Sequence, residues 1–368
     1  MNETILIWLV FILAFGGMVL IHEFGHFIVA RLCKIEVEEF GIGLPTPGAL
    51  TLFTWQGTRF TLNWLPLGGF VRPKGENDPT IPGGLAAASP WARLAVLFAG
   101  PLMNLLTAVL IYSIIFSQVG VPDTNRVLIS SVTSGGPAAQ AGFQDGDILI
   151  SGNGQPIHNY DELRVIVDAN ESKPIVFLVD RKGQQLELNV TPRMNDELDR
   201  IMIGVGLGVP FRSANSLTET LDLGARYAYL NIRTLISLPA QMLRGTLAPE
   251  QGRLIGLKGI FDVFEQTVSH DVQATTSAPV TADPVDQPIR TLDLIASLSI
   301  SLGIFNLFPF PALDGGRILF ILPELIFRRR VPHRFENLVH GMGMALLLMF
   351  MIYVNVMDFV NPVNITIP

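Results

Sequence analysis

His22, Glu23 and His26 are the residues whose types and spacing suggest chemistry most directly. They form the pattern His-Glu-x-x-His inside an apolar stretch that begins at Ile5. Residues four apart lie on one face of a helix, so the two imidazoles could hold one zinc ion, with Glu23 beside them as a general base. The pattern is typical of metalloprotease chemistry.

The surroundings of this pattern are unusual for a soluble enzyme. From Ile5 to Ala30 these three side chains are the only ionisable ones. An ionisable group at the centre of a bilayer costs roughly 2.5–3.5 kcal/mol on insertion scales, and metal ligation would offset that cost. The alternative is that His22 and His26 are polar residues packed in a helix interface.

The composition indicates a membrane protein. Hydrophobic residues make up 49% of the 368 residues and charged residues only 15%, whereas charged residues make up about a quarter of ordinary soluble domains. The single Cys33 excludes an internal disulfide framework and a cysteine-rich metal site. Four stretches are long enough to cross the hydrocarbon core as helices. They are residues 5–31, 91–117, 292–326, which is broken near its middle, and 338–360.

The distribution of lysine and arginine predicts the orientation. These residues gather between the first two predicted spans and between the last two, and neither terminus carries one. By the positive-inside rule those two loops are cytoplasmic, and both termini and residues 118–290 lie outside. The His-Glu-x-x-His motif then lies near the cytoplasmic end of its helix. The basic residues concerned are Arg31, Lys34, Arg59, Arg72, Lys74, Arg93, Arg317, Arg328, Arg329, Arg330 and Arg334.

A β-hairpin is predicted between the first two spans. Leu50–Trp55 and Arg59–Trp64 are rich in β-branched and aromatic residues and are joined by Gln56 and Gly57. Residues 66–70 follow, and the region would dip into the membrane beside the motif, where protein or a water-filled cavity covers its edge. It could align an extended substrate by strand addition, or it could be a structural plug.

Residues 122–210 are predicted to form a compact α/β module. The pattern indicates short strands, a tight turn at Asn153 and Gly154, a helix from Tyr160 to Ala169, and a second hairpin around residues 181–183. Residues 134–148 closely resemble the PDZ domain, which commonly binds peptide ends by strand addition. The alternative is a groove that serves only as a steric filter.

Two further stretches precede the third span. Residues 217–243 have the apolar spacing of an amphipathic helix, which would suit the outer membrane surface or a buried position. Residues 269–290 are rich in Ser, Thr, Ala, Pro and Asp and are predicted to be a polar linker. In the second span, Asn104 could pack against a neighbouring helix or contact the site.

The third span offers a further metal ligand, because a catalytic zinc usually has three protein ligands. Pro309 and Pro311 break the helix inside an apolar segment, and Asp314 follows the break. Asp314 could instead be a turn former. Other acidic residues of the apolar spans are predicted to lie away from the depth of the motif; they are Asp293, Glu324 and Asp358.

Taken together, the His-Glu-x-x-His motif, the PDZ-like module and the stretch 306–316 resemble the site-2 proteases of the bacterial regulator-of-sigma-E type, here in a single-PDZ form. The resemblance extends to residues 41–43, 66–69, 100–104 and 252–256. It implies that His22, His26 and Asp314 bind Zn²⁺, that Glu23 activates water, and that Asn306 holds the substrate backbone.

The resemblance implies an intramembrane zinc metalloendopeptidase. Its partners would be the lipid bilayer and single-pass membrane proteins, cut after another protease has trimmed them, as in the release of an anti-sigma factor; no nucleic acid is implied. The alternatives are an inactive PDZ membrane scaffold or a metal transporter.

The expected fold is a polytopic α-helical protein of the cell (inner) membrane with about four transmembrane helices, a membrane-associated β-hairpin and an extracytoplasmic α/β PDZ domain. The expected order along the chain follows from the patterns above. It is a first transmembrane helix with the zinc motif (1–33), a membrane-dipping hairpin region (34–90), a second transmembrane helix (91–117), the PDZ domain (122–210), an amphipathic helix and linker (211–290), a broken third segment (291–327) and a fourth helix (337–360).

Overall fold

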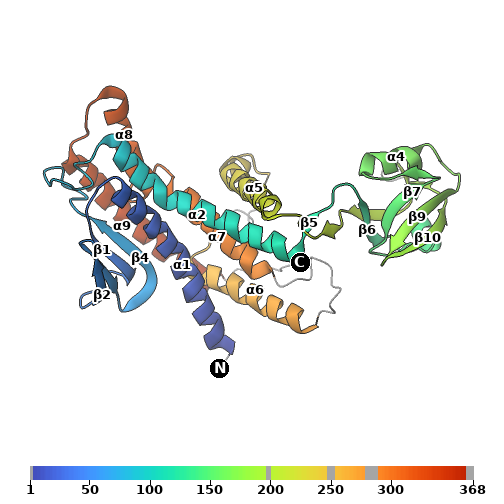
Figure 1. The fold of residues 1–368 in the computed structure, drawn as a ribbon, viewed down its shortest axis with the longest axis horizontal. Helices are drawn as coiled ribbons and strands as arrows, with labels where there is room; N and C mark the ends of the chain where they lie inside the picture. Colours follow the sequence, from blue (N-terminus) through green and yellow to red (C-terminus); the bar gives the residue numbers. More distant parts are fainter. Residues whose placement is uncertain (1–2, 196–199, 247–252, 278–288, 362–368) are drawn as a thin grey trace. The chain divides into compact units, whose positions relative to one another are not determined.

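The computed structural model describes residues 3–195, 200–246, 253–277 and 289–361. The chain divides into two compact units, each drawn in Figure 1. The helical unit comprises Met1–Phe116 and Leu217–Pro368, and the β-rich unit comprises Ser117–Ser216.

Three helices of the helical unit are long and apolar enough to cross a membrane, counting only the described part of the chain. They are α1 (Glu3–Leu32), α2 (Pro90–Val119) and α9 (His333–Val360). Much of their apolar surface is uncovered by protein, as expected where lipid rather than water is the neighbour. These helices agree with the first, second and fourth predicted spans.

The predicted third span consists of two shorter helices, α7 (Arg290–Asn306) and α8 (Asp314–Phe327). Residues 307–313 separate them. Pro309 and Pro311 lie in this break, where the missing proline N–H groups prevent a continuous helical ladder. With 17 and 14 residues, each helix is too short to cross the hydrocarbon core alone.

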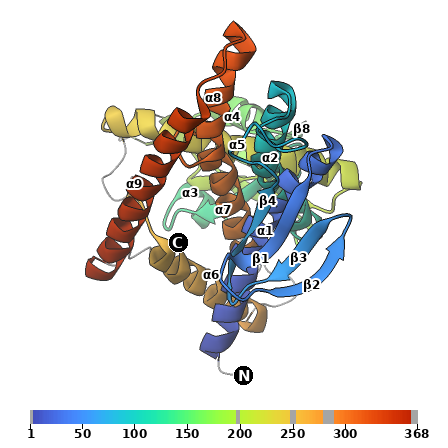
Figure 2. The same cartoon turned by 90° about the vertical axis from the view of Figure 1, so that its left-hand side faces the viewer.

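A four-stranded sheet lies beside α1 (Figure 2). Its strands are β1 (Val37–Leu44), β2 (Leu50–Trp55), β3 (Thr58–Leu62) and β4 (Leu65–Pro73), in the order β2-β3-β1-β4. The predicted hairpin is confirmed, since β2 and β3 pair antiparallel across Gln56 and Gly57. The strand packed along α1 is β4, however, and β2 is the opposite edge of the sheet.

Two helices of the helical unit follow the β-rich unit in sequence, α5 (Leu217–Leu243) and α6 (Leu257–Ser277). The prediction of a polar linker from residue 269 is wrong up to Ser277, because α6 continues through these residues. Phe261 and Phe264 of α6 pack with Ile7 and Phe11 of α1, and this packing stabilises the helix whose later turns include residues 269–277. Residues 278–288 lie outside the described part of the chain.

The β-rich unit has a five-strand path β10-β9-β7-β6-β13, with β8 paired to β7. The predicted turn at Asn153 and Gly154 and the hairpin around residues 181–183 are confirmed by these pairings. An aliphatic and aromatic core fills the space between the sheet and α4. The elements of this unit are β5 (Val121–Pro122), β6 (Val127–Val132), α3 (Pro137–Gln140), β7 (Ile148–Gly152), β8 (Gln155–Pro156), α4 (Tyr160–Asp168), β9 (Ile175–Arg181), β10 (Gln184–Val190), β11 (Arg193–Asn195), β12 (Arg200–Met202), β13 (Val205–Gly208) and β14 (Phe211–Arg212).

Candidate active site

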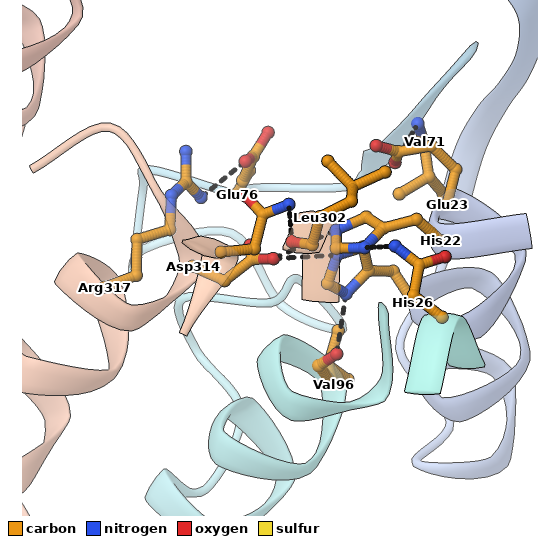
Figure 3. A network of polar contacts seen from close by, with 11 residues as sticks. His22, Glu23, His26, Val71, Glu76, Val96, Leu302, Asp314 and Arg317 are labelled. Atoms are coloured by element: carbon orange, nitrogen blue, oxygen red, sulfur yellow. Dashed lines mark hydrogen bonds and ion pairs between the residues drawn. The ribbon is translucent and has the colours of Figure 1, made fainter. Parts of the chain in front are cut away.

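Side chains from α1 and α8 converge on one point inside the helical unit (Figure 3). The Nε2 atoms of His22 and His26 lie 3.1 Å from each other. The Asp314 Oδ2 atom lies 3.1 Å from the first and 3.3 Å from the second. Both imidazoles are buried, and the Asp314 side chain is 17% exposed.

These three donor atoms fit a zinc ion. Zinc in proteins is bound mostly tetrahedrally by imidazole nitrogen and carboxylate oxygen at about 2.0–2.2 Å, which places neighbouring ligand atoms roughly 3.3 Å apart. The separations of 3.1–3.3 Å match that value. Among the described residues, these three form the cluster of His, Cys, Asp and Glu that could hold a metal ion. Three protein ligands leave a fourth position for water, as in catalytic sites.

Glu23 lies next to His22 on α1 and contacts the sheet. Its Oε2 atom accepts a hydrogen bond of 3.0 Å from the backbone N–H of Val71 on β4. The Val71 N–H therefore points away from the paired strand β1 and toward α1. The edge of β4 and the candidate general base are direct neighbours.

Helix α2 contacts both imidazoles. The Nδ1 atom of His26 donates to the Val96 carbonyl at 2.7 Å, and the Nδ1 atom of His22 lies 3.2 Å from the Asn104 amide nitrogen. Gly100 lies between Val96 and Asn104 on α2. An added Cβ at Gly100 would be 2.4 Å from His26 Nε2 and 2.8 Å from His22 Nε2. Glycine is required there because α2 approaches the ligand atoms within the radius of a methyl group.

The break before α8 delivers Asp314. Leu313 is the N-cap residue in an extended conformation, and Asp314 begins the helix. Gly315 packs on the break itself, because an added Cβ would lie 2.2 Å from the Leu307 carbonyl oxygen. On the other side, His340 of α9 accepts a hydrogen bond of 3.0 Å from the backbone N–H of Ala312, whose φ is +82°. The Asp314 carboxylate is thus held by a braced loop.

The donor atoms face a cavity of about 300 Å³. Asn306, at the end of α7, lines this cavity, and its amide donates to the Leu302 carbonyl at 3.0 Å. Arg317, one turn after Asp314, forms an ion pair with Glu76 at the wall of the same cavity. The structure thus brings together all five residues named from the sequence; they are His22, Glu23, His26, Asn306 and Asp314.

The other acidic residues considered from the sequence have different partners. Glu324 pairs with Arg93 of α2. Asp358, on α9, accepts hydrogen bonds from the backbone N–H groups of Gly256 and Gly259 and so caps the start of α6. Asp293 lies in the first turn of α7. Asp314 is the one that joins the histidines.

Comparison with known proteins gives the class. The sequence model of peptidase family M50 matches residues 10–350, and the chain belongs to this family. It is a membrane zinc metalloprotease.

Individual relatives match over nearly their full length. The chain is 30% identical over 353 residues to the Clostridium perfringens protein named "Putative zinc metalloprotease CPE1693", covering 96% of this chain and 98% of that one. It is 29% identical over 388 residues to Metalloprotease MmpA of Caulobacter vibrioides, covering 95% and 93%. A solved PDZ domain of the SdrC-like protein from Listeria monocytogenes aligns with 23% of this chain and 87% of that domain, at 17% identity and a TM-score of 0.21.

Some residues of the site were not identified from the sequence. Val71, Val96 and Gly100 act through their backbone or through the absence of a side chain, so their residue types carry little chemical signal. The spacing of Val96, Gly100 and Asn104 is the available clue, since positions four apart form one face of α2. That face is the one turned toward α1.

Proposed function

We propose that this chain is an intramembrane endopeptidase in which His22, His26 and Asp314 bind zinc. Glu23 is the general base, and Asn306 holds the substrate backbone. The observation that carries this proposal is the convergence of three ligand atoms within 3.3 Å of one another beside Glu23, although His22 and Asp314 are 292 positions apart in the sequence.

The chemistry follows from these groups. When bound, a zinc ion supplies Lewis acidity at the scissile carbonyl and makes water acidic enough to lose a proton near neutral pH. Glu23 accepts that proton as water attacks the carbonyl carbon, and then donates it to the leaving amine nitrogen. The Asn306 amide can exchange its hydrogen bond to Leu302 for one to a substrate carbonyl.

The substrate is a membrane protein, cut within its transmembrane segment. Support comes from the position of the cavity, which is lined by residues of α1 and α2, the two most hydropathic of the helices long enough to cross a membrane in the described part of the chain. A helical substrate hides its carbonyls in its own hydrogen bonds, so it has to unwind before attack. Unwinding exposes backbone groups that need new partners.

Strand β4 can supply those partners. The Val71 N–H already donates to Glu23, and residues two apart in a strand share an edge, so Gly69 is the residue that presents its backbone to the same side. An unwound segment added there would pass Glu23. The predicted hairpin is less suitable, since β2 is three strands away, roughly 14 Å at the usual strand spacing.

The orientation and the partners complete the proposal. Both termini and the β-rich unit lie outside the cell membrane, and the site lies toward the cytoplasm, on the strength of the lysine and arginine distribution. The β-rich unit is a PDZ module that filters substrates. It admits single-pass proteins already trimmed by another protease, as in regulated release of an anti-sigma factor.

The Glu23→Gln variant tests the proposal. Glutamine keeps the size and the Val71 contact but cannot accept the proton, so turnover of a purified transmembrane substrate should fall roughly 10²–10⁴-fold while zinc content is retained. Glu38→Gln, on the exposed side of β1, is the matched control and should be unchanged. Crosslinking of Glu23→Gln protein in membranes, followed by mass spectrometry, would identify trapped substrates.

Cleavage at the wild-type rate by Glu23→Gln protein would disprove the assigned role. Trapped proteins that are all soluble, or that span the membrane several times, would contradict the proposed substrate class.

A further inference from the structure

The two imidazoles of the site have different neighbours at the nitrogen that faces away from Asp314. His26 Nδ1 lies 2.7 Å from the Val96 carbonyl oxygen, which can only accept a hydrogen bond. His22 Nδ1 lies 3.2 Å from the side-chain amide of Asn104, which carries both a donor and an acceptor. Helix α2 therefore fixes the tautomer of His26, whereas the partner of His22 Nδ1 depends on which way the Asn104 amide is turned.

The number of protons that imidazole carries explains why the partner at Nδ1 matters. A neutral imidazole has one N–H and one lone pair, and a metal takes the lone pair. Ligation through Nε2 requires the proton to be on Nδ1, where it needs an acceptor. Val96 supplies this acceptor for His26. His22 needs an equivalent partner.

Asn104 is placed to be that partner. Its side chain is fully buried, and its Oδ1 atom has no hydrogen-bond partner among the described residues, although its amide nitrogen contacts His22. A buried oxygen without a partner is unfavourable, because it has lost its hydrogen bonds to water without replacement. Rotation of the amide by 180° would place Oδ1 against His22 Nδ1 and satisfy both groups. The backbone of Asn104 stays fixed, because Ser299 of α7 donates to its carbonyl at 2.9 Å.

We propose that Asn104 is a positioning residue that accepts the Nδ1–H of His22 and so keeps the Nε2 lone pair free for a metal ion. With Oδ1 turned toward Nδ1, the proton stays on Nδ1 and Nε2 would keep the lone pair that ligation requires. The inference rests on the proposed role of His22 as a ligand.

Zinc affinity of the purified full-length protein, measured by chelator competition, tests this role. Asn104→Leu removes the acceptor and should weaken zinc binding by roughly 10–100-fold, the usual effect of losing such a partner of a metal-bound histidine. Asn104→Asp keeps an acceptor at the same place and should bind zinc at least as tightly as the wild type. Ser113→Ala is the matched control, because Ser113 is also buried on α2 but bonds to Thr220, away from the site.

A second readout does not depend on the leucine variant folding. In zinc-loaded protein labelled with ¹⁵N-histidine, the Nδ1–H proton signal of His22, assigned by its loss in His22→Ala, should move downfield in Asn104→Asp because a carboxylate is the stronger acceptor. An unchanged signal, or wild-type affinity in a folded Asn104→Leu protein, would overturn the inference. If His22→Ala also kept wild-type zinc affinity, the proposed metal site itself would be wrong.

Discussion

The two units of this protein differ in the kinds of side chain that they bury. The core of the β-rich unit is aliphatic and aromatic, and among its described residues Asp147 is the one buried polar side chain. The helical unit buries polar side chains at its centre, including His22, His26 and Asn104. Burying a polar group is unfavourable unless it has partners.

The partners show what each buried group is for. Asp147 binds Arg181 in two contacts of 2.6 and 2.7 Å and accepts from the Gln144 N–H at 2.9 Å, so its bonding capacity is used within its own fold. The atoms of His22, His26 and Asp314 that meet are instead two ring nitrogens and a carboxylate oxygen, the donor set that zinc prefers. A buried polar group whose hydrogen bonds are all made within its own fold has a structural role. Ligand atoms that converge on one point indicate a functional site.

Asp314→Asn should have the largest effect on zinc binding and cleavage. The substitution keeps the shape but removes the charge that a metal ion needs, so zinc should become substoichiometric and cleavage should fall to background. Elemental analysis and a cleavage assay on purified protein check this result. Asp293→Asn, a carboxylate change on the preceding helix α7, is the control and should retain both properties.

Retained zinc and activity in the Asp314→Asn protein would mean that Asp314 is only a turn former. Glu324 would not be a ready substitute, since it is paired with Arg93.

Gly100→Ala should have the next largest effect. The new methyl group would overlap the Nε2 atoms of both imidazoles, at 2.4 and 2.8 Å, so the rings must shift. A displacement of about 1 Å at a reacting centre can lower a rate roughly 10²-fold. Turnover and zinc affinity should fall together, although no ligand has been removed.

Gly17→Ala provides the comparison for this effect. Gly17 is also a glycine within an apolar helix, and an added Cβ meets nothing within 4 Å. It should leave turnover unchanged and slightly favour the helix, by up to about 1 kcal/mol. Equal losses in the two variants would mean that helix rigidity, rather than the approach of α2 to the ligands, determines activity.

Much of the candidate site could be predicted because its chemistry depends on residue type. His22, Glu23 and His26 are identified by spacing on one helix, and Asp314 by the prolines that interrupt an apolar segment. These signals are local, and ionisable groups are rare in lipid because of their energetic penalty, so few roles besides a functional site suit them. The pairing of His22 with Asp314, 292 positions apart, was implied by the family resemblance, since the residues alone also allowed Asp314 to be a turn former.

The parts that could not be predicted depend on packing. The hairpin was identified from its turn, but nothing local indicates that β1 inserts beside β3 in parallel and places β4 against α1. Similarly, residues 269–277 have a linker composition, and α6 is helical because its aromatic face packs on α1. The sequence shows that Asn104 is a polar residue in an apolar helix, but it does not show that Asn104 contacts His22.

Asp147→Ala should have the smallest effect on catalysis and a large effect on the stability of the β-rich unit. Removing the carboxylate leaves the Arg181 guanidinium and the Gln144 N–H without their partner. Breaking a buried ion pair costs about 3–5 kcal/mol, and the lower end applies because the Arg181 side chain is 23% exposed. Thermal unfolding of the β-rich unit should therefore occur at a lower temperature in the variant. Zinc content and cleavage of a short, already trimmed substrate should remain those of the wild type, because none of the ligand atoms lies in this unit. If zinc binding fell together with the stability of the β-rich unit, the two units would be one cooperative structure, and the division between a structural and a functional use of buried charge would not hold.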